Sequence, residues 1–192
     1  MKKLLLTLAV AGMCCVMAVG GCVPNYYRPS YTPYTPTTPQ KKDYQFDKSK
    51  SAYNDSKISV SLSERCNPYT GSVEGFVLNI ENKTHNDMNL VWNETYYLSN
   101  NTVNGGFMFE GIVYSRRTDP KQDLILLPNT KQEIVIFPNA LVDYMPPTSI
   151  GSSVLPGGWS HQDIGTGEYG AYIKIRGKGI DKRIKLTLNI TY

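Results

Sequence analysis

The chain has 192 residues, of which 41% are hydrophobic and 19% are charged, and its formal net charge at pH 7 is +4. Its basic residues are scattered apart from Arg116-Arg117 and the segment KGIDKRIK at 178–185, which argues against a nucleic-acid-binding protein. The chain has two histidines, His85 and His161, and lacks CxxC, HExxH, P-loop, GxGxxG and aspartate-rich calcium motifs. We therefore expect no metal site and no cofactor.

The first 21 residues have the pattern of a secretory signal peptide. The chain starts with MKK, continues with an apolar run from Leu4 to Val19, and reaches Gly20-Gly21 immediately before Cys22. A basic start, an apolar middle and small residues at the end are the three parts of such a peptide. The apolar run is shorter than the roughly 20 residues that a membrane-spanning helix needs. We expect residues 1–21 to be removed on export.

The stretch Val19-Gly20-Gly21-Cys22 resembles the lipobox of bacterial lipoproteins. The resemblance implies that signal peptidase II cuts before Cys22, that the Cys22 sulfur carries a diacylglycerol, and that the new amino terminus is acylated. Membrane lipid would then be the first partner of the chain, because two or more acyl chains anchor a protein stably. The next residue is Val23, not the aspartate that resembles an inner-membrane retention signal of enteric bacteria, so for a Gram-negative host we expect an outer-membrane location in the cell envelope. The alternative is an ordinary secreted protein in which Cys22 lies near the cleavage site.

Residues 22–50 have the composition of a flexible, disordered linker. They contain almost no aliphatic residues, five prolines, and the repeat YTPYTP at 31–36. Such a segment cannot bury a core and favours an extended spacer. Four tyrosines lie close behind the predicted acylation site: Tyr26, Tyr27, Tyr31 and Tyr34. One interpretation is that they contact a glycan, a partner or the membrane interface. The alternative is that they belong to an inert stalk.

Residues 51–192 show the period-two alternation of β-strands. The clearest run places Ile184, Leu186, Leu188 and Ile190 on one face of a strand, with polar residues between them. Further strands are predicted at 57–62, 75–80, 89–98, 106–114, 123–127, 133–137 and 171–175. Turn sequences such as NNTVNGG at 100–106 separate them. The pattern predicts an all-β domain, an antiparallel immunoglobulin-like β-sandwich of seven to eight strands, although the usual pair of cysteines is missing.

Two residues of the predicted sandwich are assigned to its interior. Cys14 and Cys15 leave with the signal peptide and Cys22 is lipidated, so Cys66 is the one cysteine of the folded domain and no internal disulfide can form. A buried thiol is favoured over a reactive thiol or an intermolecular disulfide, since free cysteine is among the most buried residue types. Trp92 is predicted to be a core tryptophan rather than a ligand platform.

Residues 146–167 are predicted to form a long irregular loop, and long loops inside compact domains are usually functional or disordered. The candidate binding residues in and beside this loop are Leu155, Trp159, His161 and Tyr169. Tryptophan and tyrosine are enriched in binding hot spots. The alternative for Trp159 is a structural one, in which its ring covers an open end of the sandwich.

The segment GGWSHQDIGTGEYG at 157–170 also brings Ser160, His161, Asp163 and Glu168 together in sequence. Neighbouring residues on an extended chain point apart, so we predict no catalytic residue and no enzyme here. The function predicted is that of a membrane-anchored, non-enzymatic binding or structural module for another envelope or surface component, a protein or a glycan. The alternatives are a glycan- or peptidoglycan-binding module that uses Trp159 and nearby tyrosines, and a hydrolase that uses the 157–170 loop.

Overall fold

The computed structural model describes residues 41–150, 153–155 and 157–192. The predicted signal peptide, the predicted acylation site Cys22 and the predicted linker as far as residue 40 lie outside this part of the chain. Within the described ranges, no helix is both long and apolar enough to span a bilayer.

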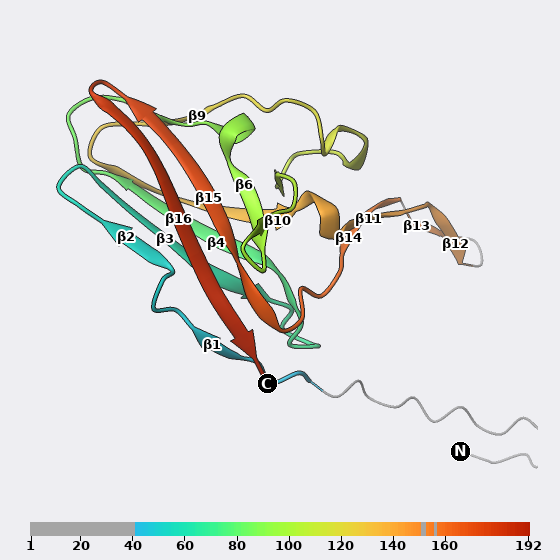
Figure 1. Cartoon of the computed structure of the whole chain (residues 1–192). Helices are drawn as coiled ribbons and strands as arrows, with labels where there is room; N and C mark the ends of the chain where they lie inside the picture. Colours follow the sequence, from blue (N-terminus) through green and yellow to red (C-terminus); the bar gives the residue numbers. More distant parts are fainter. Residues whose placement is uncertain (1–40, 151–152, 156) are drawn as a thin grey trace, which may run out of the picture. The chain divides into compact units, whose positions relative to one another are not determined.

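Two antiparallel sheets form the body of the protein (Figure 1). The first sheet consists of β1 (Gln45–Asp47), β5 (Met88–Leu90), β6 (Tyr96–Ser99), β7 (Thr102–Val103), β9 (Leu124–Leu126), β15 (Gly167–Gly177) and β16 (Ile180–Thr191). Its order is β1-β16-β15-β5-β9, and β6 pairs with both β15 and β7. The hairpin β15–β16 is its longest element, with eleven paired positions from Gly167 to Gly177.

The second sheet consists of β2 (Ala52–Asn54), β3 (Ile58–Cys66), β4 (Val73–Asn82), β8 (Phe107–Phe109) and β10 (Thr130–Pro138). Its order is β2-β3-β4-β10-β8. The predicted all-β, antiparallel sandwich is confirmed. The two sheets contain more strands than the seven to eight expected, because five of them are three-residue pieces and one has two residues.

The core lies between the two sheets and follows from the alternation of their longest strands. In β16 the residues Ile184, Leu186, Leu188 and Ile190 are all buried, and in β4 so are Phe76, Leu78 and Ile80. Burying apolar surface stabilises by roughly 25 cal/mol per Å², so this double layer supplies the main driving force for folding. Trp92 is 6% exposed and belongs to this core, as predicted.

The folded body begins before the expected boundary at Ser51. β1 pairs with β16, and Tyr44 is buried and stacks on Tyr192 with ring centroids 5.0 Å apart. Residues 44–50, assigned from composition to the linker, are therefore part of the described fold. The composition was misleading because aromatic side chains, which the aliphatic count leaves out, supply the buried surface.

Two predicted strands are interrupted by 3₁₀ helices. Residues 89–98 form β5 and β6, with helix η1 (Trp92–Glu94) between them. The Thr95 hydroxyl donates to the Val91 carbonyl at 2.9 Å and so closes this turn. Residues 106–114 were predicted as one strand, but only β8 forms there, and η2 (Tyr114–Arg116) follows it. A third helix is η3 (Asn139–Leu141).

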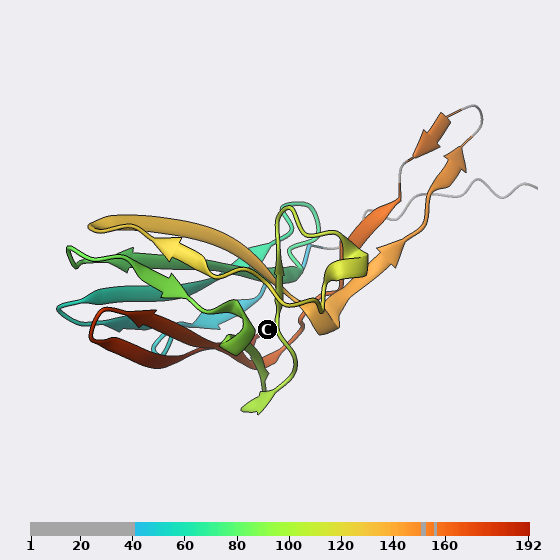
Figure 2. The same ribbon diagram turned by 90° about the horizontal axis from the view of Figure 1, so that it is seen from above.

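The predicted irregular loop at 146–167 is corrected to a mostly paired β-ribbon. β11 (Val142–Met145) pairs with β14 (Gly158–His161), and β12 (Thr148–Ile150) pairs with β13 (Ser153–Leu155). Figure 2 shows this ribbon extending away from the two sheets. The connection between the two strand pairs of the ribbon needs glycine at position 157, because a Cβ atom there would lie 2.9 Å from the Met145 carbonyl oxygen. The ribbon has no clear polar–apolar alternation, which explains why the sequence pattern missed it.

Candidate functional site

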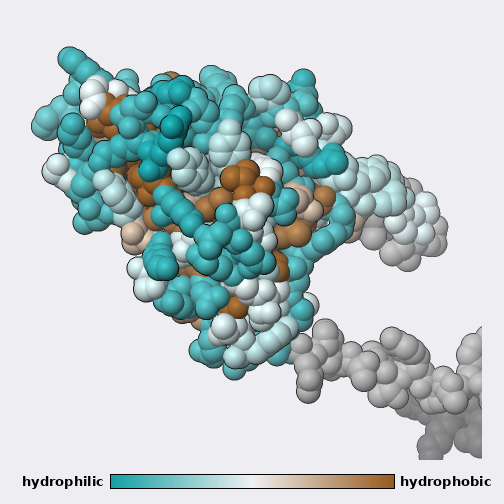
Figure 3. Space-filling view, viewed as in Figure 1, coloured by the Kyte–Doolittle hydropathy of each residue, from teal (hydrophilic) through white to brown (hydrophobic). Residues whose placement is uncertain are grey.

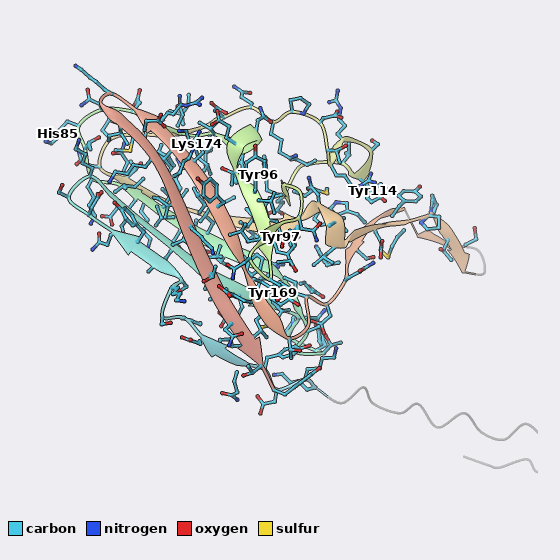
Figure 4. The ribbon with its side chains drawn as sticks, in the orientation of Figure 1. His85, Tyr96, Tyr97, Tyr114, Tyr169 and Lys174 are labelled. Atoms are coloured by element: carbon cyan, nitrogen blue, oxygen red, sulfur yellow. The ribbon has the colours of Figure 1, made fainter. Side chains whose placement is uncertain are left out.

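A groove of about 880 Å³ lies at the base of the ribbon, where the 111–115 segment meets β11 and β14. Its walls are formed by Gly111, Ile112, Val113, Tyr114, Ser115, Tyr144, Pro147, Gly157, Gly158 and Trp159. Tyr114 lies at the junction between η2 and the ribbon (Figure 4). We call this feature the aromatic groove.

Strand register places two of its rings on one face. Tyr144 and Trp159 are direct partners in the antiparallel pair β11–β14, and side chains at such positions point to the same side of the ribbon. The Tyr114 ring packs against Tyr144 from the η2 side, with centroids 5.5 Å apart. The Arg117 guanidinium lies 4.0 Å from the Tyr114 ring centroid and holds that ring by a cation–π contact. Three elements distant in sequence thus build one aromatic surface.

A second, small hydrophobic cluster supports the groove from below. Met108, Phe137 and Val142 are buried there, and Trp159 packs against them. The Trp159 ring meets Phe137 edge-on at a centroid distance of 5.2 Å. Trp159 therefore both packs against this cluster and lines the groove.

The aromatic groove is apolar and uncharged but solvent-accessible. Tyr144 is 55% exposed, and Val113 and Met145 beside it are also exposed. None of the residues that line the groove carries a charge. The whole segment 144–160 lacks Asp, Glu, Lys and Arg, in a chain of which 19% is charged. Over the ribbon the surface is paler than the teal of the charged regions (Figure 3).

His161 lies behind Trp159 rather than in the aromatic groove. Its ring stacks on Phe137 at 4.2 Å and meets Trp159 edge-on at 4.8 Å. Burial lowers the pKa of His161, against the opposing effect of Glu74, so the neutral imidazole is favoured. Its buried Nε2 has no hydrogen-bond partner among the described residues. His161 and Trp159 also line a smaller cavity of about 210 Å³, together with Arg65 and Glu110.

Two other predicted binding residues lie elsewhere. Tyr169 is 8% exposed and stacks in the main core on Tyr97, with nearly parallel rings 6.4 Å apart (Figure 4). Its hydroxyl donates to the Thr166 carbonyl at 2.8 Å. The expectation of a surface role for Tyr169 is therefore corrected to a core role. Leu155 lies in β13, where it pairs with Thr148 at the inner end of the outer half of the ribbon.

The residues of the hydrolase alternative do not converge on one point. Ser160 and His161 are successive residues of β14, so their side chains leave opposite faces of the strand. Asp163 Oδ1 accepts from the Val73 amide at 2.9 Å, and Oδ2 accepts from the Tyr44 hydroxyl at 2.7 Å and from Lys42. Burial acts to raise the pKa of Asp163, but these donors outweigh it and lower that pKa. Asp163 thus fixes the start of the described chain to the sandwich.

Cys66 is exposed, which corrects the prediction of a buried thiol. It is the last residue of β3, where a register shift between Arg65 and Cys66 ends the alternation that would have turned it inward. Partial desolvation and the nearby Glu64 carboxylate raise the pKa of its thiol, which favours the unreactive protonated form. In the described part of the chain, no group of three or more His, Cys, Asp or Glu residues is placed to hold a metal ion.

Sequence reasoning found Trp159 but missed Tyr114 and Tyr144. The strand predicted at 106–114 includes Tyr114, and Tyr144 precedes the loop predicted at 146–167. The uncharged run at 144–160 was the available signal for this surface. Comparison of the chain with protein-family models, with curated proteins and with solved structures gives no match in any of the three.

Proposed function

We propose that this protein is a lipid-anchored envelope protein whose β-sandwich is a non-enzymatic binding module for another envelope or surface component. The observation that carries the proposal is the aromatic groove: Tyr114, Tyr144 and Trp159 line one uncharged, accessible surface on a rigid scaffold. Tyrosine and tryptophan bury large areas on binding at a low cost in side-chain entropy, and charged residues are depleted at the centres of interfaces.

The anchor is supported by the sequence alone, through the lipobox-like stretch that ends at Cys22. Acylation there would attach the chain to the outer membrane, and the segment up to residue 40 would separate the binding module from the lipid. The fold suits such a module, because the ribbon that carries the groove extends away from the sheets (Figure 2).

A protein partner is better supported than a glycan. Sugars present many hydroxyl groups, and burying them requires matching hydrogen-bond partners. In the aromatic groove, however, side-chain donors and acceptors come from Ser115, the two tyrosine hydroxyls and the Trp159 indole, and the lining includes no carboxylate, amide or guanidinium side chain. Burying an apolar peptide surface requires fewer hydrogen-bond partners.

The groove can be tested in the native envelope with a photo-crosslinking amino acid at position 144. Tyr69 provides the matched control, since it is 84% exposed and lies in the turn between β3 and β4. We expect a discrete crosslinked product from position 144 and none from position 69. Equal labelling at both positions, or none at 144, would contradict binding through the groove.

The anchor requires a separate test. Cys22→Ser should release the protein from the membrane fraction or leave it as an uncleaved precursor, because no lipid can then be attached to the sulfur. A Cys22→Ser protein that is cleaved and still resists a salt wash of the outer membrane would contradict a lipid anchor.

A further inference from the structure

We infer that the aromatic groove binds the proline-rich segment at residues 29–40 of a second copy of this chain. The inference rests on the proposed binding function and names the partner. It joins two features that the fold alone leaves unexplained: an uncharged groove lined by aromatic rings, and an uncharged segment of regularly spaced prolines.

The groove has the chemistry that recognises a polyproline II helix. Such helices expose apolar ridges and have no internal hydrogen bonds, and protein domains bind them in grooves lined by aromatic side chains. Here Tyr114, Tyr144 and Trp159 provide the rings, and Pro147 adds a rigid apolar wall. Gly158 also lines the groove, and a Cβ built there would meet nothing within 4 Å, so a ligand can approach the backbone closely at this position.

The proposed ligand has the matching pattern. Residues 29–40 read PSYTPYTPTTPQ, and Pro33, Pro36 and Pro39 recur every third residue. A polyproline II helix has three residues per turn and rises about 3.1 Å per residue, so in that conformation these prolines would share one face over about 19 Å. A proline ring fixes its own φ angle, so a proline-rich ligand in general loses less entropy on binding than one without proline.

The absence of charged residues from both the segment and the groove lining supports this occupant. The segment 29–40 contains no Asp, Glu, Lys or Arg, and neither does the lining of the groove. A charged ligand would lose its hydration at this surface without meeting an opposite charge among the lining residues, and the nearby Arg117 guanidinium already lies against the Tyr114 ring. A neutral ligand has no such cost. In the cell, the proposed anchors would keep many copies on one membrane, which raises the effective concentration of segment and groove.

Two variants test the groove and the segment separately. Both are made in the unlipidated mature chain, which comprises residues 22–192 with Cys22→Ser. Tyr144→Ala removes an exposed ring of the groove, and the triple change Pro33→Ala, Pro36→Ala, Pro39→Ala removes the ridge of the segment. Tyr69→Ala is the control for loss of an exposed tyrosine. Because Tyr144 is 55% exposed, its truncation should leave the fold intact, which a thermal melt checks.

Sedimentation velocity over a concentration series measures the self-association. The Cys22→Ser chain and its Tyr69→Ala derivative should associate equally, and each of the other two variants should associate about tenfold more weakly or not at all. An equimolar mixture of the two defective variants should restore heteroassociation, because one supplies an intact groove and the other an intact segment. Association should change little with ionic strength, since no charged group takes part.

A peptide with the sequence of residues 29–40 provides an independent readout. Added to the triple proline variant, it should change the Trp159 fluorescence, and a peptide of the same composition with irregular proline spacing should not. Absence of both self-association and the peptide effect overturns the inference. If the tryptophan fluorescence of the parent chain and of the triple proline variant differs by the same amount at every protein concentration, the segment binds the groove of its own chain. That result would also overturn the second-copy assignment. A crosslink from position 144 to a different protein, with no self-association, would leave the proposed function standing and reject this inference alone.

Discussion

Replacing each tryptophan by alanine separates the core from the groove, and the two changes should have different costs. Trp92 is 6% exposed, lies in the main core and stacks on Phe109 with centroids 4.7 Å apart. Trp92→Ala should therefore lower the free energy of unfolding by about 3–5 kcal/mol, the range for removing a large aromatic side chain from a core. Trp159 packs on the smaller cluster around Phe137 but also lines the groove, so Trp159→Ala should cost about 1.5–3 kcal/mol.

Urea denaturation of the two variants and the parent chain, followed by circular dichroism, measures both costs under the same conditions. The binding assay then distinguishes the roles: Trp159→Ala should abolish crosslinking from position 144, while Trp159→Phe should restore most of the stability. An equal loss of stability for Trp159→Ala and Trp92→Ala would show that the ribbon tryptophan is a core residue. No loss for Trp159→Ala would show that the cluster around Phe137 does not hold it.

Three further predictions test the scaffold. Because the pKa of Asp163 is lower in the folded protein than in the unfolded chain, its carboxylate should stabilise the fold at pH values above the unfolded-state pKa near 3.9. This stabilisation is lost as the pH falls through the folded-state pKa. In urea denaturation, the difference in unfolding free energy between the parent chain and Asp163→Asn should therefore narrow below about pH 4. Gly170→Ala should destabilise by about 3 kcal/mol or more, because its Cβ would lie 2.0 Å from the Leu186 carbonyl oxygen, whereas Gly106→Ala, with its nearest neighbour at 3.5 Å, should fold nearly normally. The exposed Cys66 should react slowly and completely with a maleimide at neutral pH without a change in the circular dichroism spectrum, and a thiol that reacts only after unfolding would show that it is buried.

The long strands could be predicted because one face of each is apolar and the other polar. β16 follows this alternation in sequence from Ile184 to Thr191, and β4 follows it in burial from Phe76 to Glu81, so the sequence located both strands within a few residues. The ribbon could not be found in this way. Neither face of β11 and β14 is fully buried, so their residues are not sorted into polar and apolar positions. β1 escaped notice for another reason, since its buried surface comes from two aromatic residues, Tyr44 before the strand and the partly buried Phe46 within it.

The candidate site was predictable only in part. Trp159 was identified from its residue type and its unusual neighbourhood. Tyr144 becomes relevant only through its register with Trp159, and register between strands is not readable from a sequence without the turn that sets it. The surface role assigned to Tyr169 was wrong because β15 starts at Gly167, two residues earlier than the tyrosine, and turns that ring into the core.

The most direct test of a lipid-anchored binding module is the mass of its amino-terminal peptide after extraction from the native membrane. We expect a peptide that begins at Cys22 and carries a diacylglycerol on the sulfur and an acyl chain on the amino group. A mature chain that begins at Cys22 or beyond without lipid, or an uncleaved chain that retains Met1, would contradict the anchor and with it the proposed place of this protein in the cell envelope.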